Sequence, residues 1–334
     1  MKVIVDAFGG DHAPLEVILG AEMAVREKDI SIILTGNEQI ILETARKNGI
    51  KLDNIEICDT VSIVSMEDES DTVLKDKKDS SMSVGMQLLK DGTGDAFVSC
   101  GNTGALLMGA TFINKRIKGI KRAALAPILP TDNGKGAMLI DGGANVECKA
   151  DFLVQFGIMG SIYAKHIMGI ENPRVGLINN GSEQSKGTPL QKMAYDLLQH
   201  APINFIGNIE GRDLLSGKCD VIVTDGFTGN IILKVVEGMG SSFSRTLKDV
   251  FYKNALTKLG GLLVKDGIDS FKKKMDYREQ GGSPLMGISK PVIKAHGSSD
   301  ARALKNAVCQ AVKVVESGII RKIETSLPVA EEIK

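Results

Sequence analysis

Glycine-rich loops that carry Asn, Asp, Ser or Thr follow many of the apolar runs, and these residue types suit anion binding. Glycine allows positive φ and close approach of a ligand to the backbone, and the polar residues add hydrogen-bond donors. One such loop is more often a tight turn, so the recurrence of the pattern carries the prediction. The loops read Gly9-Gly10-Asp11, Gly101-Asn102-Thr103-Gly104, Gly142-Gly143-Ala144-Asn145, Asn180-Gly181-Ser182, Gly207-Asn208-Ile209-Glu210-Gly211 and Asp225-Gly226-Phe227-Thr228-Gly229-Asn230. They predict a site lined by neutral donors, suited to phosphate or to the oxyanion of acyl or phosphoryl transfer.

Lysine and histidine residues beside these loops are the candidates for holding charge or moving a proton. Lys186 lies in a Gly/Ser-rich loop just before a predicted helix, where its ammonium could neutralise a phosphate; the alternative is a solvated surface lysine. His12 follows the first glycine loop, and His296 precedes Gly297-Ser298-Ser299, which we expect to cap the last helix. A histidine beside a turn is more often a hydrogen-bonded structural residue than an acid or base.

The common nucleotide-binding and nucleophile motifs are absent. Residues 181–188 contain the glycines and lysine of a P-loop, but in the order Lys-Gly-Thr instead of Gly-Lys-Thr. Residues 238–243 lack the third glycine of a dinucleotide fingerprint and do not follow a predicted strand. The sequence has no GxSxG and no HExxH. Covalent catalysis through a nucleophile elbow is therefore not expected.

The elements that must position these loops alternate between short apolar runs and segments of helical period, which predicts parallel strands covered by helices. Ligands in such folds bind outside the carboxyl ends of the strands, where these loops lie. No linker or repeat divides the chain, so we predict one large α/β unit over residues 1–334. The predicted strands are 2–6, 31–35, 55–59, 96–99, 124–129, 137–141, 174–178, 204–207 and 220–224, and the predicted helices are 15–28, 38–48, 82–90, 152–168, 189–199 and 300–316.

Two segments depart from this alternation. Residues 62–81 are polar and predict a surface loop with a short helix. Residues 229–275 form a longer helical stretch that we expect to break at Gly260-Gly261 and to protrude as an amphipathic hairpin. Residues 245–278, which overlap its end, contain nine basic and four acidic residues, interspersed with leucines. A basic amphipathic pair can lie on an anionic membrane or meet an acidic partner, and the alternative is that its leucines pack on each other or on a second copy.

Composition excludes several classes of function. The 334 residues contain 41 Lys+Arg and 41 Asp+Glu, no Trp and 4% aromatic residues, which argues against a nucleic-acid binder. The five cysteines are scattered without CxxC pairs, as expected in a reducing cytosol. The start of the chain does not read as a signal peptide, and no apolar run approaches the length of a membrane span. We therefore expect a cytoplasmic protein.

Seven blocks of this sequence together resemble the PlsX family, bacterial acyltransferases that depend on acyl carrier protein (ACP). They occur in the family's order from residue 2 to about residue 317; Phe8 stands where the family usually has Met. The segment 278–285 departs from the family pattern at Gln280 and Pro284. The blocks begin at residues 5, 99, 141, 181, 205, 225 and 296.

The resemblance implies a reaction in which a long-chain acyl group moves from acyl-ACP to inorganic phosphate, giving acyl phosphate for phosphatidic acid and phospholipid synthesis. It implies a three-layer α/β/α fold with a mostly parallel central sheet, like that of phosphotransacetylase and isocitrate dehydrogenase, assembled as a homodimer without metal or nucleotide cofactor. The implied partners are ACP, phosphate, and a membrane glycerol-3-phosphate acyltransferase that takes the product. The implied location is the cytoplasm, with peripheral association at the inner face of the cell membrane.

The candidate residues fit this reaction, because phosphate is already a nucleophile and a thioester an activated acyl donor. Lys186 would offset phosphate charge, Asn230 would donate to the oxyanion, and His296 or Asp225 would position the attacking phosphate. We predict that phosphate or substrate is bound by Gly9, Gly10, Asp11, His12, Gly101, Asn102, Thr103, Gly104, Asn145 and Gly229. The membrane or ACP would contact Lys253, Leu256, Lys258, Leu259, Leu263 and Lys265.

Three alternatives remain at this point. A CoA-dependent phosphate acetyl- or butyryltransferase would share the loops and differ in its acyl donor. A metal- and NAD-dependent decarboxylating dehydrogenase would need a carboxylate cluster that the sequence does not provide. A non-catalytic, lipid-binding regulator at the membrane surface would use only the basic helices.

Overall fold

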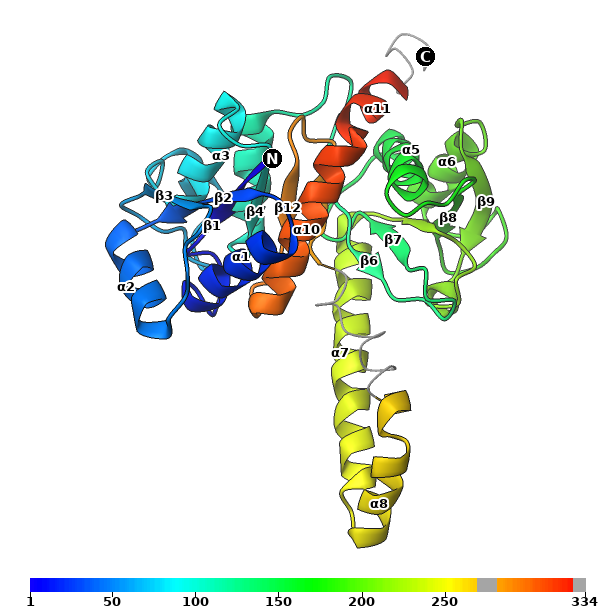
Figure 1. Cartoon of the computed structure of the whole chain (residues 1–334). Helices are drawn as coiled ribbons and strands as arrows, with labels where there is room; N and C mark the ends of the chain where they lie inside the picture. Colours follow the sequence, from blue (N-terminus) through cyan, green and yellow to red (C-terminus); the bar gives the residue numbers. More distant parts are fainter. Residues whose placement is uncertain (269–280, 327–334) are drawn as a thin grey trace.

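The structure is a computed structural model that describes residues 1–268 and 281–326, and these residues form two α/β lobes and a projecting helical arm (Figure 1). Each lobe is built on its own sheet, one of seven strands and one of five. Most strand pairs in both sheets are parallel. The predicted α/β class with mostly parallel strands is therefore confirmed, and the strands divide between two sheets.

The first lobe contains the seven-stranded sheet, in the order β3-β2-β1-β4-β12-β11-β5. The strand β11 runs antiparallel to both of its neighbours. The strands are β1 (Lys2–Asp6), β2 (Ser31–Gly36), β3 (Ile55–Asp59), β4 (Ala96–Ser99), β5 (Ala124–Leu125), β11 (Ser283–Met286) and β12 (Val292–Lys294). The helices are α1 (Leu15–Glu27), α2 (Glu38–Asn48), α3 (Ser81–Asp91), α4 (Thr103–Gly109) and α10 (Ala301–Ser317), with a 3₁₀ turn at Ser70–Leu74 and a π turn at Ala110–Asn114. Helix α11 (Ile319–Ser326) follows α10 and packs on α5 (Ala150–His166) of the second lobe.

The second lobe contains the five-stranded sheet, in the order β6-β7-β10-β8-β9. Its central strand β10 is fully buried, as a parallel strand covered on both faces must be. The strands are β6 (Ile128–Leu129), β7 (Ala137–Ile140), β8 (Arg174–Ile178), β9 (Asn204–Ile209) and β10 (Val221–Val223). The helices are α5 (Ala150–His166) and α6 (Pro189–Leu198), with a 3₁₀ turn at Gly211–Asp213.

The predicted strand 124–129 is in fact two strands that belong to different sheets. Leu125 pairs with Leu285 in the first sheet, whereas Ile128 pairs with Met138 in the second. Pro127 lies between the two strands and has no N–H to continue a ladder. The segment 124–129 therefore carries the chain from one sheet to the other.

Helix α10 packs closely on α1 in the first lobe. A Cβ atom on Gly20 of α1 would lie 2.6 Å from the carbonyl oxygen of Ala301, so only glycine allows this approach. The N-cap of α10 is Asp300, whose side chain accepts the Ala303 N–H at 2.9 Å. The expectation that residues 297–299 cap this helix is therefore wrong; they belong to the preceding loop.

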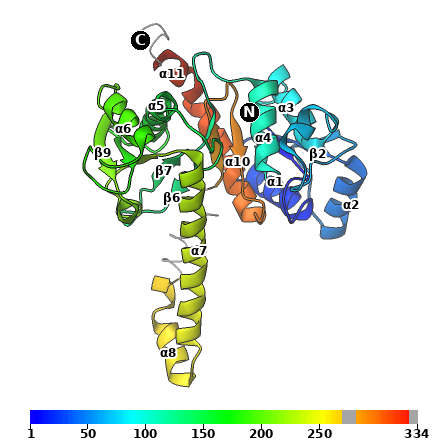
Figure 2. The ribbon, with the colours of Figure 1, turned by 180° about the vertical axis from the view of Figure 1, so that it is seen from behind.

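The arm consists of α7 (Gly226–Phe251) and α8 (Ala255–Leu263), which lies beside the far end of α7 (Figure 2). The chain turns at residues 252–254, where the Asn254 side chain accepts the Thr257 N–H and caps α8. Gly260 and Gly261 lie inside α8, so the predicted break there is wrong. Gly261 instead faces α7, since a Cβ atom there would lie 3.2 Å from Phe251. Residues 269–275 of the predicted stretch lie outside the described residues.

None of the helices in the part of the chain that the structure describes has the length and apolar character needed to cross a membrane.

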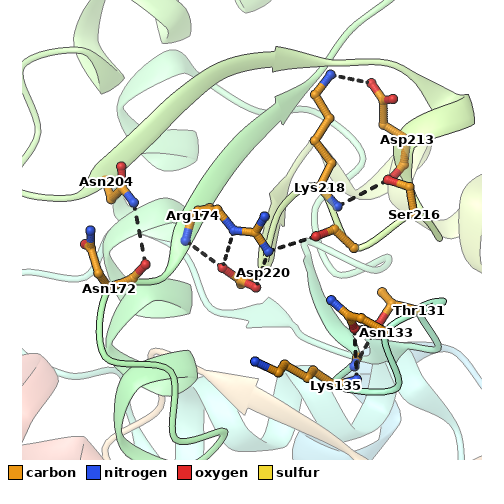
Figure 3. Close-up of polar contacts among 12 residues, drawn as sticks. Thr131, Asn133, Lys135, Asn172, Arg174, Asn204, Asp213, Ser216, Lys218 and Asp220 are labelled. Atoms are coloured by element: carbon orange, nitrogen blue, oxygen red, sulfur yellow. Dashed lines mark hydrogen bonds and ion pairs between the residues drawn. The ribbon is translucent and has the colours of Figure 1, made fainter.

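An ion pair ties the amino ends of β8 and β10 together (Figure 3). The Arg174 guanidinium donates to both carboxylate oxygens of Asp220, at 3.0 and 2.9 Å, and also to the carbonyl oxygen of Gly217. Asp220 is buried, whereas 40% of the Arg174 side chain is exposed. Burial raises the pKa of Asp220, but the hydrogen bonds from Arg174 outweigh it and hold the pKa below its usual value.

We expect Arg174→Met to lower the free energy of unfolding by about 2 kcal/mol, because it leaves a buried carboxylate with one backbone donor. Since the lowered pKa stabilises the fold only where Asp220 is ionised, the difference from wild type should shrink as the pH falls below about 4. Urea unfolding at several pH values measures both effects.

The matched control is Lys218→Met, which removes the cation of the neighbouring, more exposed pair with Asp213 at 2.9 Å. This variant should lose less than about 1 kcal/mol. Equal losses in the two variants would show that burial of Asp220 does not increase the contribution of its ion pair to the free energy of unfolding.

Candidate active site

A cavity of about 480 Å³ lies where the carboxyl ends of strands from both sheets meet. The first sheet contributes the loop after β1, the start of α4 after β4, and the end of β12 with the loop that follows. The second sheet contributes the loop after β7 and the first turns of α7 after β10. The polar lining residues are Asp11, Thr103, Asn230, Lys234, Glu237, Ser283, Lys294 and His296, and the apolar ones include Met66, Leu125, Pro127, Ile128 and Leu233.

The first-sheet wall of the cavity is held by a buried hydrogen-bond chain. The Ser99 hydroxyl donates to Asp6 at 2.7 Å and accepts the Gly101 N–H at 3.0 Å. Burial raises the pKa of Asp6, and the hydroxyl donors partly offset this. Gly9 packs against these hydrogen-bonded residues, because a Cβ atom there would lie 2.7 Å from both Asp6 Oδ2 and the Gly101 nitrogen. Asp6 therefore fixes the glycine loops after β1 and β4 against each other.

The second-sheet wall depends on Asp141, which lies at the end of β7 and is fully buried. Its carboxylate accepts the backbone N–H groups of Leu125, Gly143, Ala144 and Asn145, and the Asn145 side-chain amide, at 2.7–3.1 Å. Burial raises the pKa of Asp141, but every one of these partners is an N–H donor, which only the ionised carboxylate can satisfy in full. The Asn145 side chain is used here, and not in the cavity.

Helix α7 begins against this same loop, which places Asn230 at the cavity. Asp225 caps the helix, accepting the Thr228 N–H at 2.8 Å and its hydroxyl at 2.9 Å. Gly229 lies so close to the end of β7 that a Cβ atom would meet the carbonyl oxygen of Asp141 at 1.8 Å. Asp225 and Gly229 do not line the cavity; they position the turn of α7 that presents Asn230.

The side chain of Asn102 points away from the cavity. Its oxygen caps α4 by accepting the Ala105 N–H, and its amide donates to the carbonyl oxygens of Ser65, Met66 and Asp68. With these contacts it joins α4 to the loop 65–68. The expectation that it holds phosphate is therefore not met, whereas its neighbour Thr103 does line the cavity.

Two charged residues of α7, Lys234 and Glu237, lie beside His296 at the cavity. Lys234 Nζ lies 2.8 Å from Glu237 Oε2 and 3.4 Å from His296 Nε2. His296 Nδ1 lies 2.8 Å from the Ser298 hydroxyl oxygen and accepts the Ser298 N–H at 3.2 Å. Burial lowers the pKa of His296, partly opposed by Glu237, which favours the neutral ring near pH 7. Lys234 and Glu237 could have been found from the sequence, since they follow Asn230 at helical spacing.

Lys294, at the end of β12, is another cavity residue that the sequence does not indicate. Its side chain is only 7% exposed, and Nζ donates to the carbonyl oxygens of Cys100, at 3.2 Å, and Ala295. Burial lowers its pKa to about 8. The available signal was a single lysine inside the apolar run 291–295.

The structure brings together part of the predicted site. Asp11, Thr103, Asn230 and His296 line the cavity, and Gly9, Gly10, Gly101 and Gly104 shape the loops around it. His12 is exposed and does not line it. Lys186 is also exposed, on the loop after β8, where its carbonyl oxygen accepts an amide hydrogen of Asn179; the structure does not bring its side chain to the cavity.

The cavity combines three chemical properties. Backbone and side-chain donors line one part of it, charged groups of both signs (Lys234 and Lys294, Asp11 and Glu237) line another, and apolar side chains form the remainder. Within residues 1–268 and 281–326 no group of three or more His, Cys, Asp or Glu side chains is arranged to hold a metal ion. The arrangement can hold an oxyanion beside an apolar chain.

Comparisons with known proteins agree with the sequence blocks. Residues 1–322 match the family model described as fatty acid synthesis protein. The chain is 50% identical to a phosphate acyltransferase of Alkaliphilus oremlandii, over 97% of this chain and 96% of the relative. It is 47% identical to a phosphate acyltransferase of Thermoanaerobacterium thermosaccharolyticum, over 98% and 97% of the two chains.

Among solved structures, the fold is similar to a phosphotransacetylase from Streptococcus pyogenes, with a TM-score of 0.66 and 16% identity over 96% of this chain and 94% of that one. It is also similar to a branched-chain phosphotransacylase from Enterococcus faecalis, with a TM-score of 0.56 and 13% identity over 94% and 100% of the two chains. The expected phosphotransacetylase-like fold is therefore confirmed. The chain belongs to the fatty acid synthesis protein family that contains these phosphate acyltransferases, the family its sequence blocks resemble.

Proposed function

We propose that this protein transfers a long-chain acyl group from acyl-ACP to inorganic phosphate, giving acyl phosphate and free carrier protein. The observation that carries the proposal is a cavity in which hydrogen-bond donors and lysine side chains adjoin apolar side chains. The names of the relatives support it, since both are phosphate acyltransferases. In the reaction a phosphate oxygen attacks the thioester carbon, the C–S bond breaks, and the electron pair leaves with the carrier thiol.

The chain's own residues would contribute orientation and charge stabilisation rather than a covalent intermediate. Asn230 would donate its amide N–H to the thioester oxygen as negative charge develops there. Thr103 and the backbone of the loop 101–104 would hold phosphate, and His296 would orient it. Met66, Leu125 and Leu233 would line the start of the acyl chain.

The same proposal has the whole chain acting as one unit. The cavity needs walls from both lobes, so neither lobe alone would form it. For the homodimer, the support is a stripe of exposed apolar residues at four-residue spacing on α7: Phe227, Ile231, Val235 and Met239, each 49–61% exposed. Such a stripe on one helix face is suited to a second copy of the same helix.

The tip of the arm supports a proposal of contact with the inner face of the cell membrane. Leu256, Leu259 and Leu263 of α8 are 81%, 58% and 82% exposed, and Lys253, Lys258 and Lys265 lie beside them in the chain. Exposed leucines among lysines suit the surface of an anionic bilayer, where a membrane glycerol-3-phosphate acyltransferase would take up the product. The same lysines suit the acidic surface of ACP.

We expect phosphate-dependent release of free carrier thiol from palmitoyl-ACP, with acyl phosphate appearing at the same rate. Palmitoyl-CoA and acetyl-CoA, measured beside it, decide the donor. Turnover with acetyl-CoA alone would assign the protein to the CoA-dependent transferases. No turnover with any donor, from folded protein, would favour a binding protein without enzymatic activity.

We expect Asn230→Ala to lower kcat by about 100-fold with little change in the melting temperature, because one oxyanion donor is lost. The control is Asn204→Ala, at the amino end of β9 and away from the cavity, which should leave kcat unchanged. A kcat for Asn230→Ala close to that of wild type would remove this residue from the mechanism.

We expect the double variant Leu259→Glu, Leu263→Glu to lose binding to vesicles that contain anionic phospholipid, while its turnover of soluble palmitoyl-ACP stays normal. Carboxylates in place of these leucines oppose both apolar burial and the negative surface. Leu42→Glu, at an exposed leucine of α2, is the matched control and should bind vesicles like wild type. Unchanged vesicle sedimentation of the double variant would instead indicate that the leucines pack against protein.

A further inference from the structure

We propose that the side-chain ammonium of Lys294 binds the phosphate substrate, at the place in the cavity where β4 and β12 end. The proposal rests on the function proposed above and names a residue of that site to which the sequence assigned no role. It follows from the burial of Lys294, from its hydrogen-bond geometry and from the charges that surround it.

The first argument is the burial of Lys294. A lysine is almost never buried without a partner, because removing its charge from water is costly. Lys294 is 7% exposed, and its side chain lines the cavity rather than an apolar interior. It is the one buried lysine in the described part of the chain. Burying this ammonium therefore costs free energy, and a bound anion would offset that cost.

The second argument is its hydrogen bonds. An ammonium group has three N–H donors. Two of them go to the carbonyl oxygens of Cys100 and Ala295, which the strand ends hold in place. These contacts fix the position of Nζ and leave the third donor for an oxygen atom in the cavity. The group is thus preorganised for an acceptor before substrate arrives.

The third argument is the pattern of charge. Asp6 and Asp11 stabilise the ammonium from the loops of the first sheet, Lys234 of α7 opposes it, and the Cys100 thiol lies beside it. Lys234 already has a carboxylate partner, Glu237 at 2.8 Å, which also lies 3.8 Å from His296. Lys294 has no direct carboxylate partner among the described ion pairs. A phosphate dianion would supply that partner, and Lys186 does not line the cavity.

Two other roles for Lys294 make different predictions. If it only ties the ends of β4 and β12 together, its loss should lower stability and leave phosphate affinity unchanged. If it stabilises the oxyanion of the thioester, its loss should lower kcat without weakening the binding of phosphate. Phosphate binding measured without an acyl donor separates these roles from the one proposed.

The experiment compares wild type, Lys294→Met and the control Lys118→Met, an exposed lysine away from the cavity. Inorganic phosphate is titrated by calorimetry, and KM values for phosphate and palmitoyl-ACP are measured separately. We expect the Kd and KM of phosphate to rise at least about tenfold in Lys294→Met, in line with loss of a charged hydrogen bond, and KM for palmitoyl-ACP to change less than about twofold. A phosphate Kd within about twofold of wild type would overturn the proposal.

A second measurement needs no variant, and so decides the matter if Lys294→Met does not fold. Because burial lowers the pKa of Lys294 to about 8, its ammonium loses its proton above that pH, whereas phosphate stays dianionic. Wild-type affinity for phosphate should therefore fall at least about tenfold between about pH 8 and about pH 9.5. Affinity that is flat across this range would contradict the proposal.

The outcomes for this residue and for the reaction are separable. If wild type binds phosphate and Lys294→Met does not, but palmitoyl-ACP yields no acyl phosphate, the role of Lys294 stands and the proposed reaction fails. If wild type makes acyl phosphate and Lys294→Met keeps its phosphate affinity, the reaction stands and the role of Lys294 fails.

Discussion

The buried carboxylate of Asp141 is the contact on which the junction of the two lobes depends. It belongs to the end of β7 in the second sheet, yet it accepts the backbone N–H of Leu125 in β5 of the first sheet. The other N–H groups that it accepts shape the loop 142–145, against which α7 begins. Removing the charge would leave these donors unsatisfied in a buried place, which costs more than the bonds contribute when formed. The second-sheet wall of the cavity, including the position of Asn230, depends on this group.

The wall from each lobe has a carboxylate that holds loops and takes no direct part in the chemistry. Asp6 holds the glycine loops of the first sheet through Ser99, and Asp141 holds those of the second. The groups that face substrate in our proposal are, by contrast, neutral donors and cations. Asp6 and Asp141 therefore build the walls of the site, and the cavity itself is lined by Lys234 and Lys294 beside Asp11 and Glu237.

Much of the fold could be predicted from the sequence, because most strands are continuous apolar runs followed by glycine and most helices have a clear apolar face. β1, β3, β4 and β8 have the predicted bounds. β11 and β12 could not be predicted, since they are three or four residues long and each has a proline in it or just before it. The segment 124–129 reads as one strand because its residues are apolar, and only Pro127 indicates the break.

Only part of the site could be predicted, because the sequence does not show the direction of each side chain. Sequence position shows which loops follow strands, but not which way a side chain turns. Asn102 and Asp225 have the residue types of ligands and also those of N-caps, and the structure uses them as caps. Lys186 lies in a loop, where the sequence indicates a ligand, whereas Lys294 lies in an apolar run, where it indicates none. The chemistry of Lys294 depends on burial, which requires the packed structure.

The continuity of α7 has a mechanical consequence. One unbroken helix carries both Asn230, at the cavity, and Phe251, at the far end of the arm. At 1.5 Å per residue, these positions are about 30 Å apart along one rod. The rod is anchored at its first turn by Asp225 and Gly229, so it acts as a lever whose pivot lies beside the cavity. In the proposed membrane contact, a small tilt would carry the tip through a wide arc while Asn230 hardly moves, so the tip would follow an undulating surface without disturbing the alignment of the reacting groups.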